Sequence, residues 1–387
     1  MSSFIKRCFN AIIIRSVWFF FRLFPVKQKK ITISSFYGRG YGDNPKYIVE
    51  ELIKKCPQLK IVWLVKDDKE KSTLPIGVQA CRANSIKSVY HLMTSKVWVD
   101  NCRKFFIMFK RRKQFYIQTW HGFALKRIEK DAADKLSPDY VKSSKRDSKN
   151  IDCIISCSKF MTGLYRNSFW YDGEILEVGA PRNDVLLKDN ADIREKVCAL
   201  LDVDPNKRIV LYAPTFRANK AMDTYCIDYA RLKNSCEKRF NEEFEIVVRL
   251  HPNIANKSKD MALDQQIVDA SFYPDMQELM LASDIIISDY SSVMFDFALT
   301  YRPCFQFATD IDEYKNDRNF YFEPNKLPFS VSVNNEELEY NIVNFDEAVY
   351  REGLQKFFEN VGMIMDGKAS EKCADLIIEK CYGKQVK

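Results

Sequence analysis

The sequence contains only three histidines among 387 residues, and no cysteines or histidines are spaced as they are in zinc sites. Its twelve cysteines are scattered and include no Cys-x-x-Cys pair, which favours reduced, mostly buried thiols in a cytoplasmic protein. The phosphate-binding loop GxxxxGK[ST] is also absent, which excludes a P-loop enzyme. The sequence therefore predicts neither a metal site nor a bound cofactor.

The sequence also lacks an apolar run long enough to span a bilayer. The nearest approach is the amino-terminal stretch FIKRCFNAIIIRSVWFFFRLFPVKQKK, which two arginines interrupt. On a helix its basic residues fall on one stripe and its large apolar residues lie roughly opposite. The basic residues are Arg7, Arg15 and Arg22, the apolar ones are Phe9, Ile13, Phe20 and Phe24, and Lys27, Lys29 and Lys30 follow. This pattern is typical of an amphipathic helix at a membrane surface.

Two other interpretations fit an apolar amino-terminal stretch of this kind. A signal peptide is disfavoured because no small-residue cleavage site follows the apolar part. A helix buried against the rest of the protein also fits the pattern. We expect residues 1–29 to associate with the membrane.

The composition indicates a folded protein, with 46% hydrophobic and 29% charged residues. Sixty basic residues against 52 acidic ones give a net charge of +8. This modest excess suits anionic partners such as nucleotides, phosphorylated polymers or acidic lipid surfaces, without choosing among them.

Apolar strand-like runs alternate with longer amphipathic stretches, as they do in parallel sheets with crossover helices. The expected strands of a first unit are 30–36, 60–67, 95–101, 115–122, 150–158 and 175–179. In a second unit, beginning near residue 190, they are 207–217, 244–253, 283–292 and a strand after a helix at roughly 293–301. We therefore predict an α/β protein of two similar units, 30–190 and 191–387. Ligands of such sheets lie beyond the carboxyl ends of the strands.

Polar and charged residues gather at these predicted strand ends. They are His121, Arg182, Thr215, Arg217, Arg249, His251, Asp289, Ser291 and Ser292. His121 lies between Trp120 and Gly122 at a strand-to-helix turn, where a packed structural histidine and a functional one are both reasonable. The clustering favours the functional interpretation.

The stretch SDYSSVMFDFA places Ser291 and Ser292 at a predicted helix start, where unpaired N–H groups attract phosphate. An ordinary serine N-cap would explain one serine, but not both together with Asp289 and Asp296. Arg249 and His251 alternate along a strand and face the same way, which suits a phosphate. A structural histidine hydrogen-bonded to a carbonyl fits His251 equally well.

Several motifs occur together and in order: QTWHGFALKRIEKD, GAPRND, YAPTFR, VVRLHPN, SDIIISDYSSVMFDFALTYRPCFQF and DGKASEK. In this combination the chain resembles the CDP-glycerol glycerophosphotransferase family of teichoic-acid and capsule assembly enzymes, from about residue 30 to its end. The segment FYGRGYGDNPKYI also resembles members that act on poly(polyol phosphate) chains.

The resemblance implies a GT-B-like fold, with two Rossmann-like domains facing a central cleft and attachment to the cytoplasmic face of the membrane. Residues 30–190 would form the acceptor domain and 191–387 the CDP-polyol domain. The implied reaction moves a polyol phosphate, glycerol phosphate first, from CDP-glycerol or CDP-ribitol to a hydroxyl of a lipid-linked saccharide or polyol-phosphate polymer, and releases CMP. Nucleic acid is not an implied partner.

The resemblance also assigns roles to matching positions. His121, as general base, and His251 would be catalytic. The CDP-polyol site would contain Gly122, Phe123, Ala124, Leu125, Arg182, Thr215, Phe216, Arg249, Leu250, Ser291, Ser292 and Asp296. The chain departs from the family at Phe123 and Ala124, where members often have threonine and proline.

Two other functions fit the same fold. One is a GT-B glycosyltransferase that uses a nucleotide sugar in cell-surface polysaccharide synthesis. The other is a non-catalytic protein that binds a polymer at the membrane surface, although the presence of both His121 and His251 argues against it.

Overall fold

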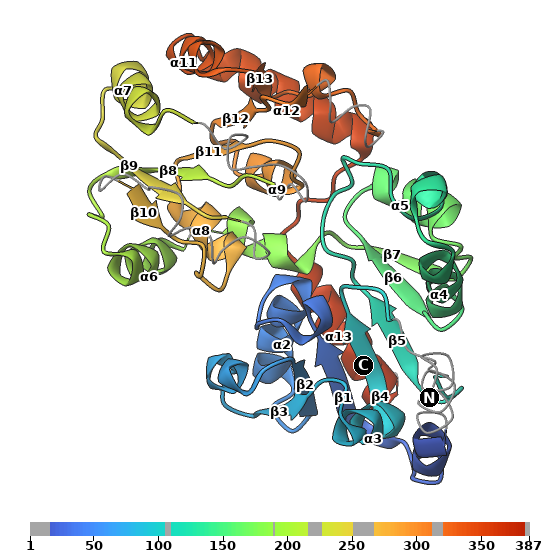
Figure 1. Cartoon of the computed structure of the whole chain (residues 1–387). Coiled ribbons are helices and arrows are strands. Elements are labelled where there is room, and N and C mark those ends of the chain that lie inside the picture. Colours follow the sequence, from blue (N-terminus) through green and yellow to red (C-terminus); the bar gives the residue numbers. More distant parts are fainter. Residues whose placement is uncertain are drawn as a thin grey trace, which may run out of the picture. The chain divides into compact units, whose positions relative to one another are not determined.

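The computed structural model describes residues 16–104, 110–188, 190–215, 227–250, 267–311 and 320–383. The chain divides into two compact units. Met1–His121, Glu129–Asp184 and Asp366–Lys387 form the first unit, and Gly122–Ile128 and Val185–Met365 form the second. Each unit contains one parallel β-sheet with its own helices, so the predicted α/β class is confirmed (Figure 1).

The first unit has a seven-stranded parallel sheet in the order β3-β2-β1-β4-β5-β6-β7. Its strands are β1 (Lys27–Ser34), β2 (Lys60–Val65), β3 (Val78–Arg82), β4 (Ser95–Asp100), β5 (Phe115–Gln118), β6 (Cys153–Ser156) and β7 (Glu174–Glu177). The chain builds outward from β1 to β3 and then returns to the other side of β1 with β4. Such a reversal of strand order is where open α/β sheets bind ligands.

The second unit repeats this topology with six strands in the order β10-β9-β8-β11-β12-β13. They are β8 (Arg208–Tyr212), β9 (Phe244–Val248), β10 (Ile267–Asp269), β11 (Ile285–Ser288), β12 (Cys304–Phe307) and β13 (Ser330–Ser332). Its helices include α6 (Ala191–Leu201), α7 (Tyr229–Phe240), α8 (Met276–Ala282), α9 (Val293–Ala298), α11 (Asn335–Val343) and α12 (Glu347–Val361). Strand order reverses between β8 and β11.

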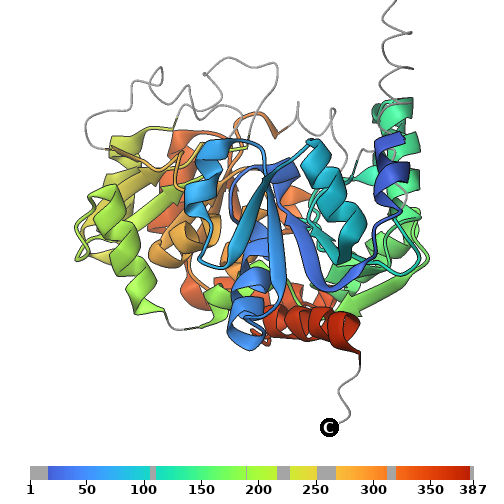
Figure 2. The same cartoon turned by 90° about the horizontal axis from the view of Figure 1, so that it is seen from below.

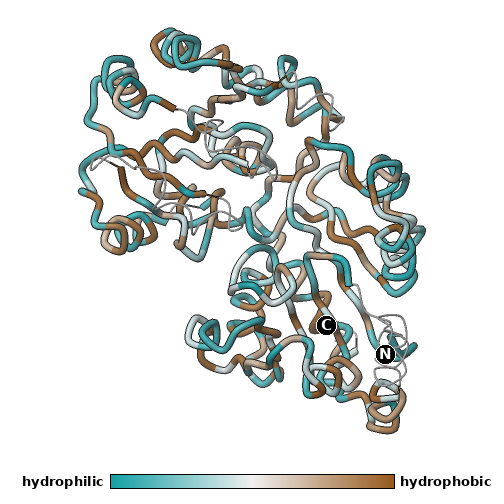
Figure 3. Tube along the Cα trace, in the orientation of Figure 1, coloured by the Kyte–Doolittle hydropathy of each residue, from teal (hydrophilic) through white to brown (hydrophobic). Residues whose placement is uncertain are grey.

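Alternate residues of a strand point to the same face of the sheet, and this determines which side chains of β1 form the core of the first unit. Ile31 and Ile33 of β1 are fully buried with Ile48 and Leu52 of α2 (Asp43–Lys55) in one apolar cluster. Burying each such side chain contributes about 1.5–3 kcal/mol. The strands of both sheets are accordingly among the hydrophobic parts of the trace in Figure 3. The remaining helices of this unit are α3 (Ile86–Thr94), α4 (Pro138–Ser148), α5 (Lys159–Ser168) and α13 (Ala369–Tyr382).

The carboxyl-terminal helix α13 corrects the domain boundaries predicted from the sequence. The boundaries assign all of 191–387 to the second domain, yet Asp366–Lys387 belongs to the first unit. Cys373 and Ile377 of α13 join the apolar cluster of the first sheet, and the helix runs beside that unit's strands in Figure 2. Asp184 accepts hydrogen bonds from the Ala369 and Ser370 backbone at 3.1 and 2.7 Å, which fixes the start of α13.

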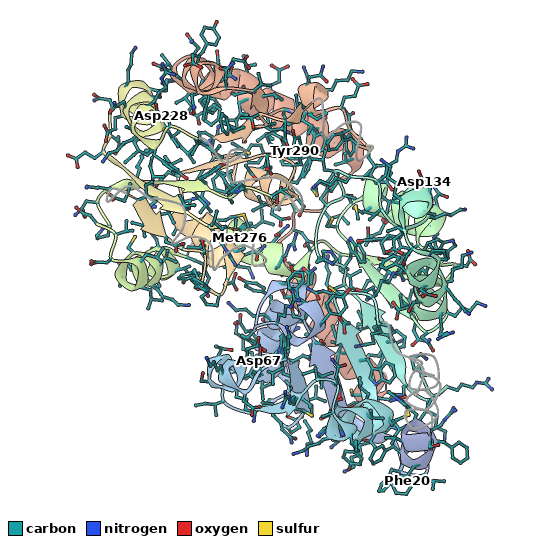
Figure 4. The ribbon with its side chains drawn as sticks, in the orientation of Figure 1. Phe20, Asp67, Asp134, Asp228, Met276 and Tyr290 are labelled. Atoms are coloured by element: carbon teal, nitrogen blue, oxygen red, sulfur yellow. The ribbon has the colours of Figure 1, made fainter. Side chains whose placement is uncertain are left out.

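Residues 16–21 are helical and lead into β1, whereas 1–15 lie outside the described residues. Trp18 is buried and Phe21 contacts Tyr90 edge-on, but four apolar side chains are exposed: Phe19, Phe20, Leu23 and Phe24. Phe20 points away from the ribbon (Figure 4). No helix in the described part of the chain is both long and apolar enough to cross a membrane.

Lys30 differs from the prediction that it adds surface charge behind this segment. Its side chain is buried in β1, and its ammonium group donates a hydrogen bond to Thr94 Oγ1 at 2.7 Å. Burial lowers the pKa of Lys30 to about 7. The difference arises because Lys30 is the first buried residue of β1, whereas Lys27 and Lys29 of the same strand are exposed.

Candidate functional site

His121 follows β5 in a turn that requires unusual backbone geometry. Trp120 has φ 52° and Gly122 has φ 152°, both in the region that favours glycine. The side chain of Gln118 stabilises the turn, because its Oε1 accepts a hydrogen bond from the Trp120 backbone at 3.0 Å. The turn thus presents the imidazole at the carboxyl edge of the first sheet.

The imidazole of His121 is half-buried and oriented by two contacts. Nδ1 lies 2.6 Å from the carbonyl oxygen of Asn101, which follows β4, and the ring stacks on Trp120 with centroids 4.3 Å apart. Because a carbonyl can only accept, Nδ1 must carry the proton, and the lone pair of the neutral ring is then on Nε2. The described residues form no hydrogen bond with Nε2.

Burial lowers the pKa of His121 below the ordinary histidine value of about 6.5. The hydrogen bond to Asn101 and the charge of Asp43 oppose this shift without reversing it, and Arg182 adds to it. The imidazole is therefore neutral near pH 7, which is the protonation state that a general base needs.

Arg182 holds the backbone of this turn from the other side. It lies in the 3₁₀ segment η4 (Pro181–Leu187) after β7, and its side chain is buried. Nη1 donates hydrogen bonds to Asp43 Oδ2 at 2.6 Å and to the His121 carbonyl at 2.7 Å. The family resemblance assigns Arg182 to the CDP-polyol site, and in the structure its Nη1 supports the His121 turn.

Asn44 completes this support. Its Oδ1 accepts a hydrogen bond from the Arg182 backbone at 3.0 Å, and its Nδ2 donates to the Trp120 carbonyl at 2.9 Å. Asp43 and Asn44 begin α2, immediately after the glycine-rich turn that follows β1. Four segments far apart in sequence therefore fix the position of one imidazole.

The residues after His121 belong to the second unit. Phe123, Ala124 and Leu125 are all buried, and the Phe123 ring lies 4.7 Å from that of Phe295 in α9. The Leu125 carbonyl accepts a hydrogen bond from the Tyr321 backbone at 2.8 Å. These three side chains, predicted to contact a nucleotide, pack in an apolar core, so a contact with a nucleotide would come from backbone or from Gly122.

The chain returns to the first unit at Glu129, which is buried. Arg103 Nη2 donates to Glu129 Oε2 at 2.9 Å, and Arg103 Nη1 donates to Ser148 Oγ at the same distance. This buried ion pair anchors the far end of the crossing segment, and removing one partner of such a pair is strongly destabilising.

In the second unit, the predicted residues follow three neighbouring strands. Thr215 comes after β8, Arg249 after β9, and Ser291 and Ser292 after β11. Because β9, β8 and β11 are adjacent and parallel, these residues share one edge of the sheet. Asp289 connects two of the strand ends: its carboxylate accepts from the Thr215 backbone at 3.0 Å and from the Thr215 hydroxyl.

Arg249 carries a buried polar atom that the described structure does not satisfy. Its Nη1 is buried and has no hydrogen-bond partner among the described residues. Burial lowers the pKa of Arg249 to about 10, against the opposing charge of Asp275, and the guanidinium stays protonated. A buried cationic donor without a partner fits an anionic ligand. Its neighbour Leu250, also predicted as a ligand, is buried in the core.

Ser291 and Ser292 are half-buried and precede α9. Ser291 Oγ accepts a hydrogen bond from the Val293 backbone at 3.3 Å, whereas Ser292 occupies the N-cap position without a side-chain capping bond. Asp296 is buried inside the first turn of α9. Tyr290, labelled in Figure 4, is fixed by a hydrogen bond from its hydroxyl to Asp310 at 3.0 Å.

Two predicted residues, His251 and Phe216, lie outside the described residues, as does Arg217. Within the described ranges, no group of three or more histidine, cysteine or acidic side chains could hold a metal ion. His91 is buried in α3, where burial lowers its pKa to about 4.

Sequence reasoning missed the residues that support His121. Asp43 accepts from the Arg182 side chain, Asn44 bonds to the Arg182 and Trp120 backbone, and the Asn101 carbonyl holds the His121 ring. These partners are distant in sequence, and no local pattern reveals such pairs. The one available signal was the pair of consecutive polar residues between Gly42 and Pro45, because a helix start exposes such side chains.

Comparison with known protein families identifies the chain. Residues 16–379 match the family of CDP-glycerol:poly(glycerophosphate) glycerophosphotransferases. The chain belongs to this family. The resemblance inferred from the six motifs is therefore confirmed, and the match covers nearly all of both units.

Individual relatives of this glycerophosphotransferase family member are assembly enzymes for teichoic acid. The chain is 33% identical to a teichoic acid poly(glycerol phosphate) polymerase of Staphylococcus epidermidis, over 91% of this chain and 51% of the relative. It therefore spans about half the length of that polymerase. It is 29% identical to a teichoic acid glycerol-phosphate transferase of Staphylococcus aureus, over 97% of this chain and 100% of the relative.

The same family member is similar in structure to the wall teichoic acid polymerase TagF. The TM-score is 0.84 at 31% sequence identity, and the match covers 97% of this chain and 96% of the TagF chain.

Proposed function

We propose that the protein transfers a polyol phosphate, most specifically glycerol phosphate, from a CDP-polyol to a hydroxyl of a lipid-linked saccharide or growing teichoic-acid-type polymer. The family and the names of both relatives support this assignment. The observation that carries the proposal is the geometry of His121: Nδ1 is held at 2.6 Å by a carbonyl, and the lone pair of a neutral ring remains on Nε2.

The reaction begins when the acceptor hydroxyl approaches Nε2 of His121. The imidazole takes the proton as the hydroxyl oxygen attacks the β-phosphorus of the donor. The bond from this phosphorus to the bridging oxygen breaks, and CMP leaves with the electron pair. Positioning and charge stabilisation account for most of the catalysis in phosphoryl transfer, so no covalent protein intermediate is needed.

The donor pyrophosphate is assigned to the carboxyl edge of the second sheet. Arg249 supplies a buried cationic donor, and Ser291 and Ser292 supply hydroxyl and backbone N–H groups. His251 is proposed as a second catalytic group beside Arg249. A GT-B-like arrangement, in which the ends of both sheets face one cleft, would bring this donor site to His121.

We also propose that the protein works at the cytoplasmic face of the membrane. The exposed side chains of Phe19, Phe20, Leu23 and Phe24 support this assignment, because burying aromatic and leucine side chains in the headgroup region is favourable. Arg22 is exposed beside them and suits anionic headgroups.

A donor screen tests the proposed function. The full chain is incubated with CDP-glycerol, CDP-ribitol and UDP-sugars in the presence of a lipid-linked acceptor, and released nucleotide and product mass are measured. We expect CMP release with CDP-glycerol and an added mass of one glycerol phosphate per transfer. Release of UDP from a sugar donor would contradict the proposal and would show instead that the protein is a glycosyltransferase. No turnover with any donor would favour a binding protein.

A further inference from the structure

The segment that follows β1 presents two exposed aromatic side chains beside His121. Phe36 and Tyr37 lie in the 3₁₀ segment η1 (Phe36–Gly38), with 37% and 47% of their side chains exposed. Their φ angles are 42° and 61°. Consecutive aromatic residues at positive φ are uncommon, and such backbone strain persists where the surrounding structure imposes it.

Asn101 imposes this geometry and connects it to the base. Its Oδ1 accepts a hydrogen bond from the Phe36 backbone at 2.8 Å, and its Nδ2 donates to Ser35 Oγ at 3.3 Å. The carbonyl of the same residue holds His121 Nδ1. One asparagine therefore fixes both the imidazole and the aromatic segment.

Gly38 fixes the other end of the segment. Its carbonyl accepts a hydrogen bond from the Lys66 backbone at 2.7 Å, and a Cβ at this position would lie only 2.9 Å from that nitrogen. With φ 91° and backbone at this distance, the position requires glycine. The aromatic segment is thus a rigid part of the sheet edge.

The position of Phe36 relative to the base is defined by ring geometry. Its ring centroid lies 5.7 Å from that of His121, with the two planes at 60°. Trp120 occupies one side of the imidazole, so Phe36 approaches it from a different direction while remaining exposed to solvent. A substrate hydroxyl bound at the imidazole would therefore have this exposed ring nearby.

We infer that Phe36 and Tyr37 bind the terminal polyol or sugar unit of the acceptor, whose hydroxyl His121 deprotonates. This inference rests on the proposed function. The C–H groups of a polyhydroxylated carbon chain are weakly positive and suit the negative face of an aromatic ring. Binding sites for small polar ligands commonly combine such aromatic surfaces with a few polar groups.

Arg39 adds a charge to this surface. Its side chain is exposed and forms no ion pair or hydrogen bond with the other residues that the structure describes. A guanidinium suits a phosphodiester, because its planar donors match two phosphate oxygens. The acceptor assigned to this surface is therefore a polyol or sugar unit followed by a phosphodiester.

Substitution of the aromatic residues tests the inference. The acceptor is a short oligo(glycerol phosphate) with a free terminal hydroxyl, and CMP release from CDP-glycerol is measured. For Phe36→Ala we expect the acceptor KM to rise about tenfold, with the donor KM unchanged. Phe36→Tyr should restore the acceptor KM. Tyr37→Ala should act in the same direction, and Arg39→Gln should raise the KM of phosphorylated acceptors only.

A matched control is Tyr340→Ala, which removes an aromatic residue 68% exposed on α11 and should leave both KM values unchanged. An unchanged acceptor KM in Phe36→Ala, with the wild type active, would overturn this inference alone. A fall in kcat with a shifted pH profile would also overturn it, since Phe36 would then act through His121. Absence of CMP release by the wild type would instead remove the proposed function and this inference with it.

Discussion

The two units have sheets of the same strand order, but the carboxyl edges of those sheets carry different chemistry. In the first unit, the edge is a network of hydrogen bonds from Asp43, Asn44, Asn101 and Arg182 around one imidazole. In the second, the edge presents hydroxyls and the buried guanidinium of Arg249. The topology therefore determines where a site forms, and the residues at the strand ends determine what it does.

This contrast suggests a division of labour. A group that transfers a proton must be placed accurately, and the many contacts to the His121 turn fit the proton transfer that we propose for it. A group that binds phosphate needs charge and accessible donors, and the unpartnered Nη1 of Arg249 among the described residues fits the phosphate site that we propose. Substitutions in the first unit should therefore change the chemical step, and substitutions in the second should change donor affinity.

The largest effect is expected for His121→Ala. Loss of a general base typically lowers the rate by about 10² to 10⁴. The rate of CMP release should fall by this factor, while the affinity for CDP-glycerol, measured by calorimetry, stays nearly constant. His91→Gln is the control, because it changes a buried histidine away from the proposed site. Undiminished turnover in His121→Ala would remove the imidazole from the mechanism.

A slightly smaller effect is expected for Asp43→Asn. Asparagine tolerates the φ of 59° at this position, so the change removes the charge that pairs with Arg182 and keeps the backbone. Breaking a buried ion pair costs about 3–5 kcal/mol, which denaturant unfolding would measure. The rate of CMP release should fall while the donor KM changes little.

The control for Asp43→Asn is Asp375→Asn in the same unit. Asp375 pairs with Lys55 at 2.7 Å on the surface, and exposed pairs contribute about 0–1 kcal/mol. Equal losses of stability in the two variants would show that burial adds nothing to the Asp43–Arg182 pair.

Next in size is Arg249→Gln in the second unit. Hydrogen bonds to charged groups contribute about 1.5–3 kcal/mol, so the donor Kd should rise roughly tenfold to a hundredfold. Arg208→Gln is the control, because Arg208 lies at the start of β8 and pairs with Glu242. If Arg249→Gln left the donor Kd unchanged and lowered kcat, Arg249 would act in the chemical step. The assignment of donor binding to the second unit would then be wrong.

The smallest effect concerns pH. Because burial lowers the pKa of His121, the neutral base persists below pH 6.5, and the acid limb of kcat/KM should be centred under that value. The lowered pKa also makes the free energy of unfolding depend on pH. The folded state disfavours the protonated ring, so the free energy of unfolding falls as the pH drops below about 6.5. An acid limb of kcat/KM centred above pH 6.5 would contradict a lowered pKa of His121.

The fold was predictable from the sequence where apolar runs are long. Strands such as β1, β2, β8 and β11 are buried on both faces, and their runs of isoleucine, valine and leucine mark them. The three-residue strands β10 and β13 escaped detection, because so short a segment shows no periodicity. The location of α13 was also missed, because an amphipathic pattern does not say which sheet a helix covers.

The candidate site was predictable in part. Strand-end reasoning placed His121 and Arg182 at one edge, and the structure joins them through a hydrogen bond. Strand ends alone do not distinguish a residue that binds a ligand from one that supports a neighbour, and the assignment of Arg182 and Phe123 to the CDP-polyol site stays a prediction from the family resemblance. The sequence also does not reveal which way a turn residue points, and the Phe123 side chain packs on Phe295.

The path of the chain around His121 has a mechanical consequence. The polypeptide leaves the first unit at the peptide bond after this residue, contributes seven residues to the second, of which Phe123, Ala124 and Leu125 are buried, and is anchored again at Glu129. The chain passes between the two units at four points, and two of these points flank the segment Gly122–Ile128, which directly follows His121. Because the peptide bond after His121 leads directly into this segment, a substitution that disturbs the packing of Phe123 should also disturb the His121 turn through the covalent chain.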